Sequence, residues 1–223
     1  MSGTIAFSAE DVQIELRDRG EPLVRLFRHP GSAFQMPPEQ YRTNRYDPPP
    51  GNESKFAVLY TADNIAAAAM ETRVLHVSPY DEYSYTERRA QPYKVVRLQY
   101  GRPALFIRMD SSAFRTKLGI PRFTGADYLP FRRAALALFE RYGETVDGYS
   151  WESFHRGQPG RNYGFWHHRK SVIDLQPLQQ EADCHELLKD SEWLSMLAVN
   201  PVIELRPDDD PGGATPKTTP GAS

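Results

Sequence analysis

The sequence predicts a single α+β domain in which mixed, mainly antiparallel sheets pack against helices. Strand-like apolar segments outnumber helical ones, and the two kinds do not alternate regularly as they do in a doubly wound sheet. The chain has 223 residues, of which 39% are hydrophobic and 12% aromatic. That length and composition are enough for one buried core with some decoration around it.

The first part of the chain is expected to contain two strands separated by a long loop. Residues 23–27 form a short strand in which Arg25 shares one side with its apolar second neighbours. Residues 30–51 are rich in proline and cannot continue a helix or a central strand. Long loops inside compact domains are often functional. The second strand is expected at residues 56–60.

A helix should follow, begin at Asp63 or Asn64 as its N-cap, and continue to about Val77. Its pattern consists almost entirely of Ala, Ile and Met, apart from Glu71. An unpaired buried carboxylate costs several kcal/mol. We therefore expect a cation or a set of donors beside Glu71, and the arginines upstream are candidates.

The remainder of the chain reads as further strands, a longer helix and short terminal elements. Strands are expected at residues 93–100, 104–109, 146–151, 163–167, 172–175 and 202–205, and helices at 127–142 and beyond 181. Residues 80–92 are polar and tyrosine-rich and read as an insertion. We expect a lead-in over 1–19, the main domain over 20–206 and a disordered tail over 207–223.

Composition excludes several classes of protein. The net charge of −2 gives no electrostatic reason to expect nucleic acid or a membrane surface as a partner. A single cysteine, Cys184, cannot form an internal disulfide and suits a reducing compartment. The N-terminus has no secretory pattern, and no apolar run approaches the roughly 20 residues that span a bilayer. We expect a soluble cytoplasmic protein, and the sequence leaves its oligomeric state open.

The familiar signatures of cofactor and metal sites are absent. The sequence has no glycine-rich dinucleotide fingerprint, no Walker loop, no Cys or His pair at zinc spacing and no nucleophile elbow. His167 and His168 are adjacent, so on a strand their side chains point to opposite faces. No metal site is predicted.

Several other side chains are candidates for ligand binding, each with a structural alternative. The guanidinium groups of Arg25 and Arg45 suit phosphate or carboxylate, although single arginines more often form surface ion pairs. Tyr46 and Tyr60 could stack on a base or a nicotinamide ring, or be half-buried aromatics only. Ser153 lies at a strand end, where a hydroxyl can donate to a ligand.

Glu71 has two interpretations on residue type alone. It could form a satisfied Glu–Arg pair in the core. Alternatively, its carboxylate could stabilise a developing positive charge, as acidic groups do at an oxocarbenium-like centre.

In combination, these segments resemble the RES-domain family, which is named for its arginine, glutamate and serine. The matching features are Leu-Val-Arg25, the run Arg45-Tyr46-Asp-Pro-Pro, the run Leu-Tyr60-Thr-Ala-Asp, and Glu71 in an alanine-rich helix. Their order and spacing are fairly specific, and the resemblance covers residues 20 to about 175. The strand that follows Gly148 places a serine, number 153, at the family's serine position.

The resemblance implies a fold akin to ADP-ribosyltransferases and a toxin of a bacterial toxin–antitoxin module. Such a toxin cleaves the nicotinamide–ribose bond of NAD by hydrolysis or phosphorolysis and thereby depletes cellular NAD. It needs no cofactor, because NAD is the substrate and phosphate a possible co-substrate. A cognate antitoxin of the Xre, helix-turn-helix type would neutralise it. Domain 20–206 would be the catalytic domain.

The resemblance also implies roles for individual residues. Arg25 and Arg45 would bind the diphosphate or ribose hydroxyls, and Tyr60 would line the nicotinamide side. Glu71 would stabilise the ribosyl cation, and Ser153 would orient the ribose. Tyr46 stands where members have tryptophan, so it is expected at the ligand as well.

Two alternatives remain open at this point. The chain could transfer ADP-ribose to a protein instead, as some members of the family do, or it could be a catalytically inactive module that only binds a nucleotide. The sequence does not choose between water and phosphate as acceptor, and it identifies neither the antitoxin nor a role as a secreted effector.

Overall fold

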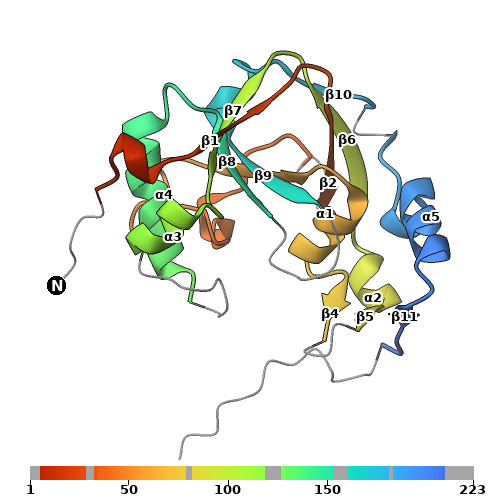
Figure 1. Ribbon diagram of the computed structural model, residues 1–223. Coiled ribbons are helices and arrows are strands. Elements are labelled where there is room, and N and C mark those ends of the chain that lie inside the picture. Colours follow the sequence, from red (N-terminus) through yellow and green to blue (C-terminus); the bar gives the residue numbers. More distant parts are fainter. Residues whose placement is uncertain are drawn as a thin grey trace, which may run out of the picture.

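The protein is an α+β domain built on one large curled sheet, as predicted (Figure 1). The computed structural model describes residues 6–28, 33–78, 82–118, 127–152, 160–180 and 183–208. Within these residues, an eight-stranded sheet has the order β1-β7-β8-β9-β3-β2-β6-β10. A smaller sheet has the order β11-β5-β4.

The large sheet is antiparallel except for the pair β7 and β8. Its strands, in spatial order, are β1 (Ile14–Arg17), β7 (Ala104–Arg108), β8 (Gly148–Glu152), β9 (Arg161–Trp166), β3 (Val58–Ala62), β2 (Pro22–Phe27), β6 (Lys94–Tyr100) and β10 (Leu175–Pro177). The small sheet consists of β11 (Ile203–Leu205), β5 (Tyr83–Tyr85) and β4 (His76–Val77).

The helices flank the large sheet. They are α1 (Ile65–Glu71), α2 (Glu87–Ala90), α3 (Ser112–Leu118), α4 (Leu129–Tyr142) and α5 (Ser191–Val199). Short 3₁₀ helices are Ala9–Asp11, Glu39–Tyr41, His167–Lys170 and Leu187–Lys189. Figure 1 shows α3 and α4 together at one end of the sheet and α5 at the other, with α1 beneath β2.

Three apolar clusters hold these layers together. One surrounds α1 and reaches α5 through Trp193, and a second fills the space between the sheet and α4. The third collects side chains from β2, β3, β6, β7 and β9, so the strands curl around it. At one point the packing requires a glycine, because a Cβ on Gly148 would lie 2.0 Å from the carbonyl oxygen of Gly164.

Strands β2 and β3 are joined by very little backbone pairing. Their ladder contains the single pair Val24 and Ala62. Beyond it, Arg25 on β2 reaches across to β3, where its Nη1 donates to the carbonyl oxygen of Tyr60 at 2.8 Å. A side chain thus links the two strands where the backbone ladder ends.

The helix expected to reach Val77 ends at Glu71 instead. Thr72 follows as its C-cap, and Arg73 adopts the left-handed conformation at φ 59°. Backbone amides then close the end: Arg73 N–H donates to Met70 and Val74 N–H donates to the carbonyl oxygen of Ala69. This pair of bonds is a Schellman motif, which normally has glycine in the left-handed position. Because residue 73 is an arginine, no glycine marks the end of this helix in the sequence.

Two other expectations were misplaced. Residues 172–174 form a turn, and β10 begins only at Leu175, because the amides of Val172 and Ile173 bond back to the carbonyl oxygen of Arg169. His167 and His168 lie in a 3₁₀ helix rather than on a strand. Strand β1 was not anticipated, since Ile14 and Leu16 are exposed and form no apolar run.

The remaining regions hold elements that had no assignment. Part of the tyrosine-rich stretch 80–92 forms β5 and α2. At the other end, Asp208 accepts a bond from the backbone N–H of Arg88 at 3.0 Å. The rest of the predicted tail, 209–223, lies outside the described residues. Within the described ranges, the helices are too short and too polar to cross a bilayer.

Asp190 ties α5 to the large sheet. Its carboxylate accepts the backbone amides of Glu192 and Trp193 at 3.0 and 3.2 Å. It also receives both Nη groups of Arg97 on β6 at 2.8 and 2.9 Å. One buried side chain therefore caps a helix and forms a bidentate ion pair.

We expect Asp190→Ala to lower the free energy of unfolding by about 3 kcal/mol, because it removes a helix cap and leaves charged donors with fewer partners. Urea denaturation measures this. Glu186→Ala is the control, since Glu186 forms an exposed ion pair with Lys189. Its loss should cost less than about 0.5 kcal/mol. Equal effects of the two substitutions would contradict the assigned role.

Candidate active site

Glu71 is the last residue of α1 and is half-buried. Trp151 Nε1 on β8 donates to its Oε2 at 3.3 Å. Burial raises the pKa of Glu71, and the positive charge of Arg45, the bond from Trp151 and the charge of Arg73 each act in the opposite direction. The carboxylate thus has the cations and the donor that were expected from the sequence, yet the effect of burial on its pKa is larger than theirs.

The position of Glu71 is set by how α1 is held at its start. Asn64 caps the helix by accepting the amide of Ala67 at 2.9 Å. Glu192, from the start of α5, accepts the amide of Ile65 at 3.2 Å. The alanines of α1 are buried and let the chain approach closely, since a Cβ on Gly160 would lie 2.8 Å from that of Ala67.

Aromatic rings lie next to the carboxylate. The Trp151 ring lies with its centroid 4.7 Å from that of Tyr46 and 6.0 Å from that of Tyr60. Tyr46 and Trp151 are fully buried. Burial raises the pKa of the Tyr46 hydroxyl, and the charge of Glu71 adds to that rise. The structure thus brings together Tyr46, Tyr60 and Glu71 of the predicted set.

Tyr60 is oriented by a second carboxylate, Asp47. The Tyr60 hydroxyl donates to Asp47 Oδ1 at 3.1 Å, and the Asn44 amide donates to Oδ2 at 2.7 Å. Burial raises the pKa of Asp47 to about 6, although these bonds lower it. The loop itself is anchored by Arg132 on α4, whose Nε donates to the carbonyl oxygen of Pro48 at 2.8 Å.

Arg45 and Arg73 flank a single tyrosine, Tyr128, just before α4. The Arg45 guanidinium carbon lies 5.2 Å from the centre of the Tyr128 ring and 5.4 Å from that of Phe131. Arg73 Nη2 donates to the Tyr128 hydroxyl at 2.8 Å. Cation–π contacts of this kind hold a guanidinium in place without neutralising it.

Arg25 approaches this group from the opposite face of the sheet. On β2 it shares a face with Leu23 and Phe27, both of which belong to the cluster inside the curled sheet, whereas Val24 and Leu26 face the cluster around α1. Its link to the site is the bond to the carbonyl oxygen of Tyr60. Burial lowers the pKa of Arg25 to about 10, so it remains a cation at neutral pH.

Ser153 lies outside the described residues. Strand β8 ends at Glu152, one residue earlier. The prediction that this serine orients a ribose therefore remains a prediction.

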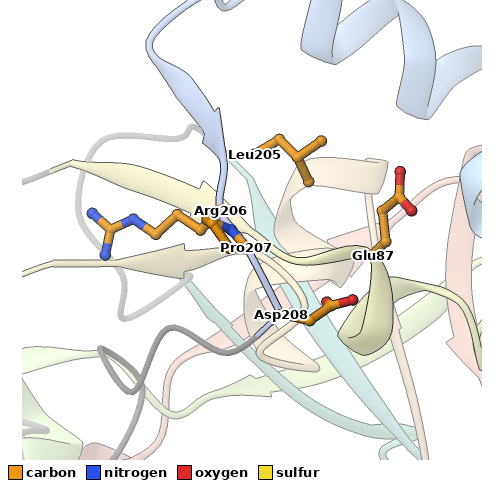
Figure 2. Close-up of a pocket in the computed structure, with 5 residues that line it drawn as sticks. All are labelled: Glu87, Leu205, Arg206, Pro207 and Asp208. Carbon is orange, nitrogen blue, oxygen red and sulfur yellow. The ribbon is translucent and has the colours of Figure 1, made fainter.

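Two hollows of the described structure lie elsewhere. One of about 400 Å³ is lined by Glu87, Leu205, Arg206, Pro207 and Asp208 (Figure 2). The other, of about 250 Å³, is lined by residues that include Arg42, Phe56, His167 and His168. Neither is lined by Glu71, so chemistry and not volume selects the candidate site. In the described ranges, no three His, Cys, Asp or Glu side chains are grouped to hold a metal.

Comparison with known proteins gives the family. The model of the RES domain matches residues 22–186. This chain belongs to the RES-domain family. Among solved structures, a chain of the crystal structure of the M. tuberculosis MbcT–MbcA toxin–antitoxin complex has a TM-score of 0.50 and 17% identity. The match covers 74% of this chain and 84% of that chain, and at this identity it shows a shared fold. No curated protein gives a significant match.

In this RES-domain protein, sequence reasoning missed three residues around Glu71. Trp151 lies in the segment that was examined for its serine, and alternation along β8 places its ring on the face opposite Ser150. Asp47 entered the sequence analysis only as part of the run Arg45-Tyr46-Asp-Pro-Pro. Arg73 was assigned to the interior of a longer helix, where nothing indicates a functional arginine.

The Asp47 carboxyl should make stability depend on pH. Its pKa rises from 3.8 to about 6 on folding. The folded state therefore holds this proton more tightly than the unfolded state. The stability that this proton contributes is fully present below the unfolded-state pKa and is lost as the pH rises through the folded-state pKa. It amounts to about 3 kcal/mol.

Asp47→Asn removes this titration. We expect the wild-type minus variant difference in unfolding free energy to fall by about 2.5 kcal/mol between about pH 4 and about pH 7. Urea denaturation across this range measures it, and all other titrating groups cancel in the difference. A difference that stays constant or grows with pH would be incompatible with a raised pKa at Asp47.

Proposed function

We propose that this protein is an NAD-degrading toxin that cleaves the nicotinamide–ribose bond. The observation that carries the proposal is the arrangement at Glu71: a half-buried carboxylate beside two guanidinium groups and an aromatic wall. Such a site combines what a dinucleotide substrate needs. The cations match its diphosphate, and the ring of Tyr60, which is the partly exposed member of this wall, matches a planar base or nicotinamide.

In the proposed reaction, the bond between C1′ of the ribose and the nicotinamide nitrogen breaks. Its electron pair neutralises the pyridinium ring, and positive charge develops on C1′ and the ring oxygen. The Glu71 carboxylate stabilises that charge, and this stabilisation is stronger in the transition state than in the ground state. Water then forms the new C1′–O bond and releases a proton, or phosphate forms it in phosphorolysis.

We propose the antitoxin partner and the cellular compartment of the toxin from the family to which the chain belongs. The fold is shared with a chain of a toxin–antitoxin complex, which supports a cognate antitoxin partner for this chain. We propose an antitoxin of the Xre type and action in the cytoplasm, where NAD is available. The buried thiol of Cys184, which is the single cysteine of the chain, is compatible with that reducing compartment.

The test is nicotinamide release from NAD by the purified chain, with and without phosphate. We expect Glu71→Gln to reduce the rate about a hundredfold or more, because the variant keeps the shape and removes the charge. Glu204→Gln is the control, since Glu204 is exposed on β11. Acceleration by phosphate would identify phosphorolysis.

Other outcomes separate the alternatives. ADP-ribose label retained on protein would replace hydrolysis by transfer to a protein acceptor. Binding of NAD by the folded wild type without any product would leave a nucleotide-binding module. Full activity of Glu71→Gln would remove the role assigned to this carboxylate.

Trp151 should influence the acid side of the pH profile of kcat/KM. Its bond lowers the pKa of Glu71, so Trp151→Phe should raise that pKa further. The carboxylate is the active form, and the pH at which kcat/KM falls on the acid side should therefore move upward. Trp166→Phe is the matched control, because Trp166 is a buried tryptophan of the same cluster. A limb shifted equally by both substitutions would point to packing alone.

A further inference from the structure

Arg73 occupies a backbone position that usually belongs to glycine. It is the left-handed residue of the Schellman motif that ends α1, at φ 59°. A side chain there is strained, because its Cβ crowds the backbone, and glycine is the common solution. Strained residues of this kind concentrate at functional sites, where the side chain is needed more than the local stability.

The Arg73 side chain projects to the candidate site. It is exposed, and its Nη2 donates to the hydroxyl of Tyr128, the ring over which Arg45 lies. Both arginines act electrostatically on the Glu71 carboxylate. Two guanidinium groups thus converge near one carboxylate, with a tyrosine between them as a spacer.

We propose that Arg73 is a ligand-binding residue that, with Arg45, grips the diphosphate of the dinucleotide. The identity of this ligand rests on the proposed function. Two guanidinium forks match the two charges of a diphosphate, and each fork can bond two phosphate oxygens. The backbone strain is explained by this role, because glycine at the same position would end the helix equally well but provide no cation.

Arg45 and Arg73 would contribute differently to the grip. Arg45 is half-buried and lies over two rings, so its guanidinium is fixed before the ligand arrives. Arg73 is exposed, and among the described residues its guanidinium is held by one side-chain bond, to the Tyr128 hydroxyl. It can therefore adjust to the ligand, and its loss should affect binding more than the chemical step.

The decisive variant is Arg73→Gly, which removes the charge and relieves the strain together. We expect binding of ADP-ribose to weaken about tenfold, measured by calorimetry on the full chain. Binding of nicotinamide riboside, which has no phosphate, should be unchanged. The denaturation midpoint in urea should stay equal or rise, and the KM for NAD should rise while kcat changes little.

Two matched variants isolate the charge from the backbone. Arg73→Lys keeps a cation and should retain most of the affinity. Asp174→Gly relieves the same kind of strain at φ 49° beside β10 and should leave ADP-ribose binding unchanged. Together they show whether affinity follows charge at residue 73 or relief of strain.

Different results would contradict the role of Arg73 and the proposed reaction. Unchanged ADP-ribose affinity in Arg73→Gly, or an equal loss for nicotinamide riboside, would overturn the role of Arg73 while NAD cleavage by the wild type could stand. Binding of ADP-ribose that depends on Arg73, without nicotinamide release, would keep the inference and overturn the proposed reaction. A wild type that binds no ADP-ribose would overturn the inference outright.

Discussion

A partly desolvated carboxylate at the end of a buried helix is the constraint on which the rest of this structure depends. Helix α1 carries almost nothing but small apolar residues, so it can lie close against the sheet. That closeness is what desolvates Glu71. The desolvation in turn requires cations and donors around it, and they come from three different parts of the chain: the loop before β3, the turn after α1 and strand β8.

The long loop before β3 is irregular but is held by specific bonds. Arg132 on α4 donates to backbone carbonyl oxygens of this loop, and Asp47 joins the loop to the hydroxyl of Tyr60. Because proline has no backbone N–H to donate to a ladder, side-chain hydrogen bonds hold this segment in place instead. A loop held in this way can present Arg45 and Tyr46 as rigidly as a strand would.

The sequence predicted the α+β class and most of the strands, because apolar runs of strand length separated by turn residues are a strong local signal. It also made Glu71 a candidate site residue, since one charge in an alanine-rich helix stands out. It failed where the outcome depends on contacts between distant segments. The helix end at Arg73 uses a left-handed arginine, and β1 consists of alternating exposed and half-buried residues that only pairing with β7 makes into a strand. The bond from Trp151 to Glu71 joins residues eighty positions apart.

The contact between Glu192 and the first turn of α1 has a consequence for how this protein can evolve. The family domain matches only as far as residue 186, yet Glu192 holds the amide of Ile65, and Asp190 ties the same region to β6. The segment beyond the family domain therefore helps to position the helix that carries Glu71. Deletion of that segment during evolution should therefore be disfavoured, and substitutions in it should be accompanied by compensating substitutions around α1.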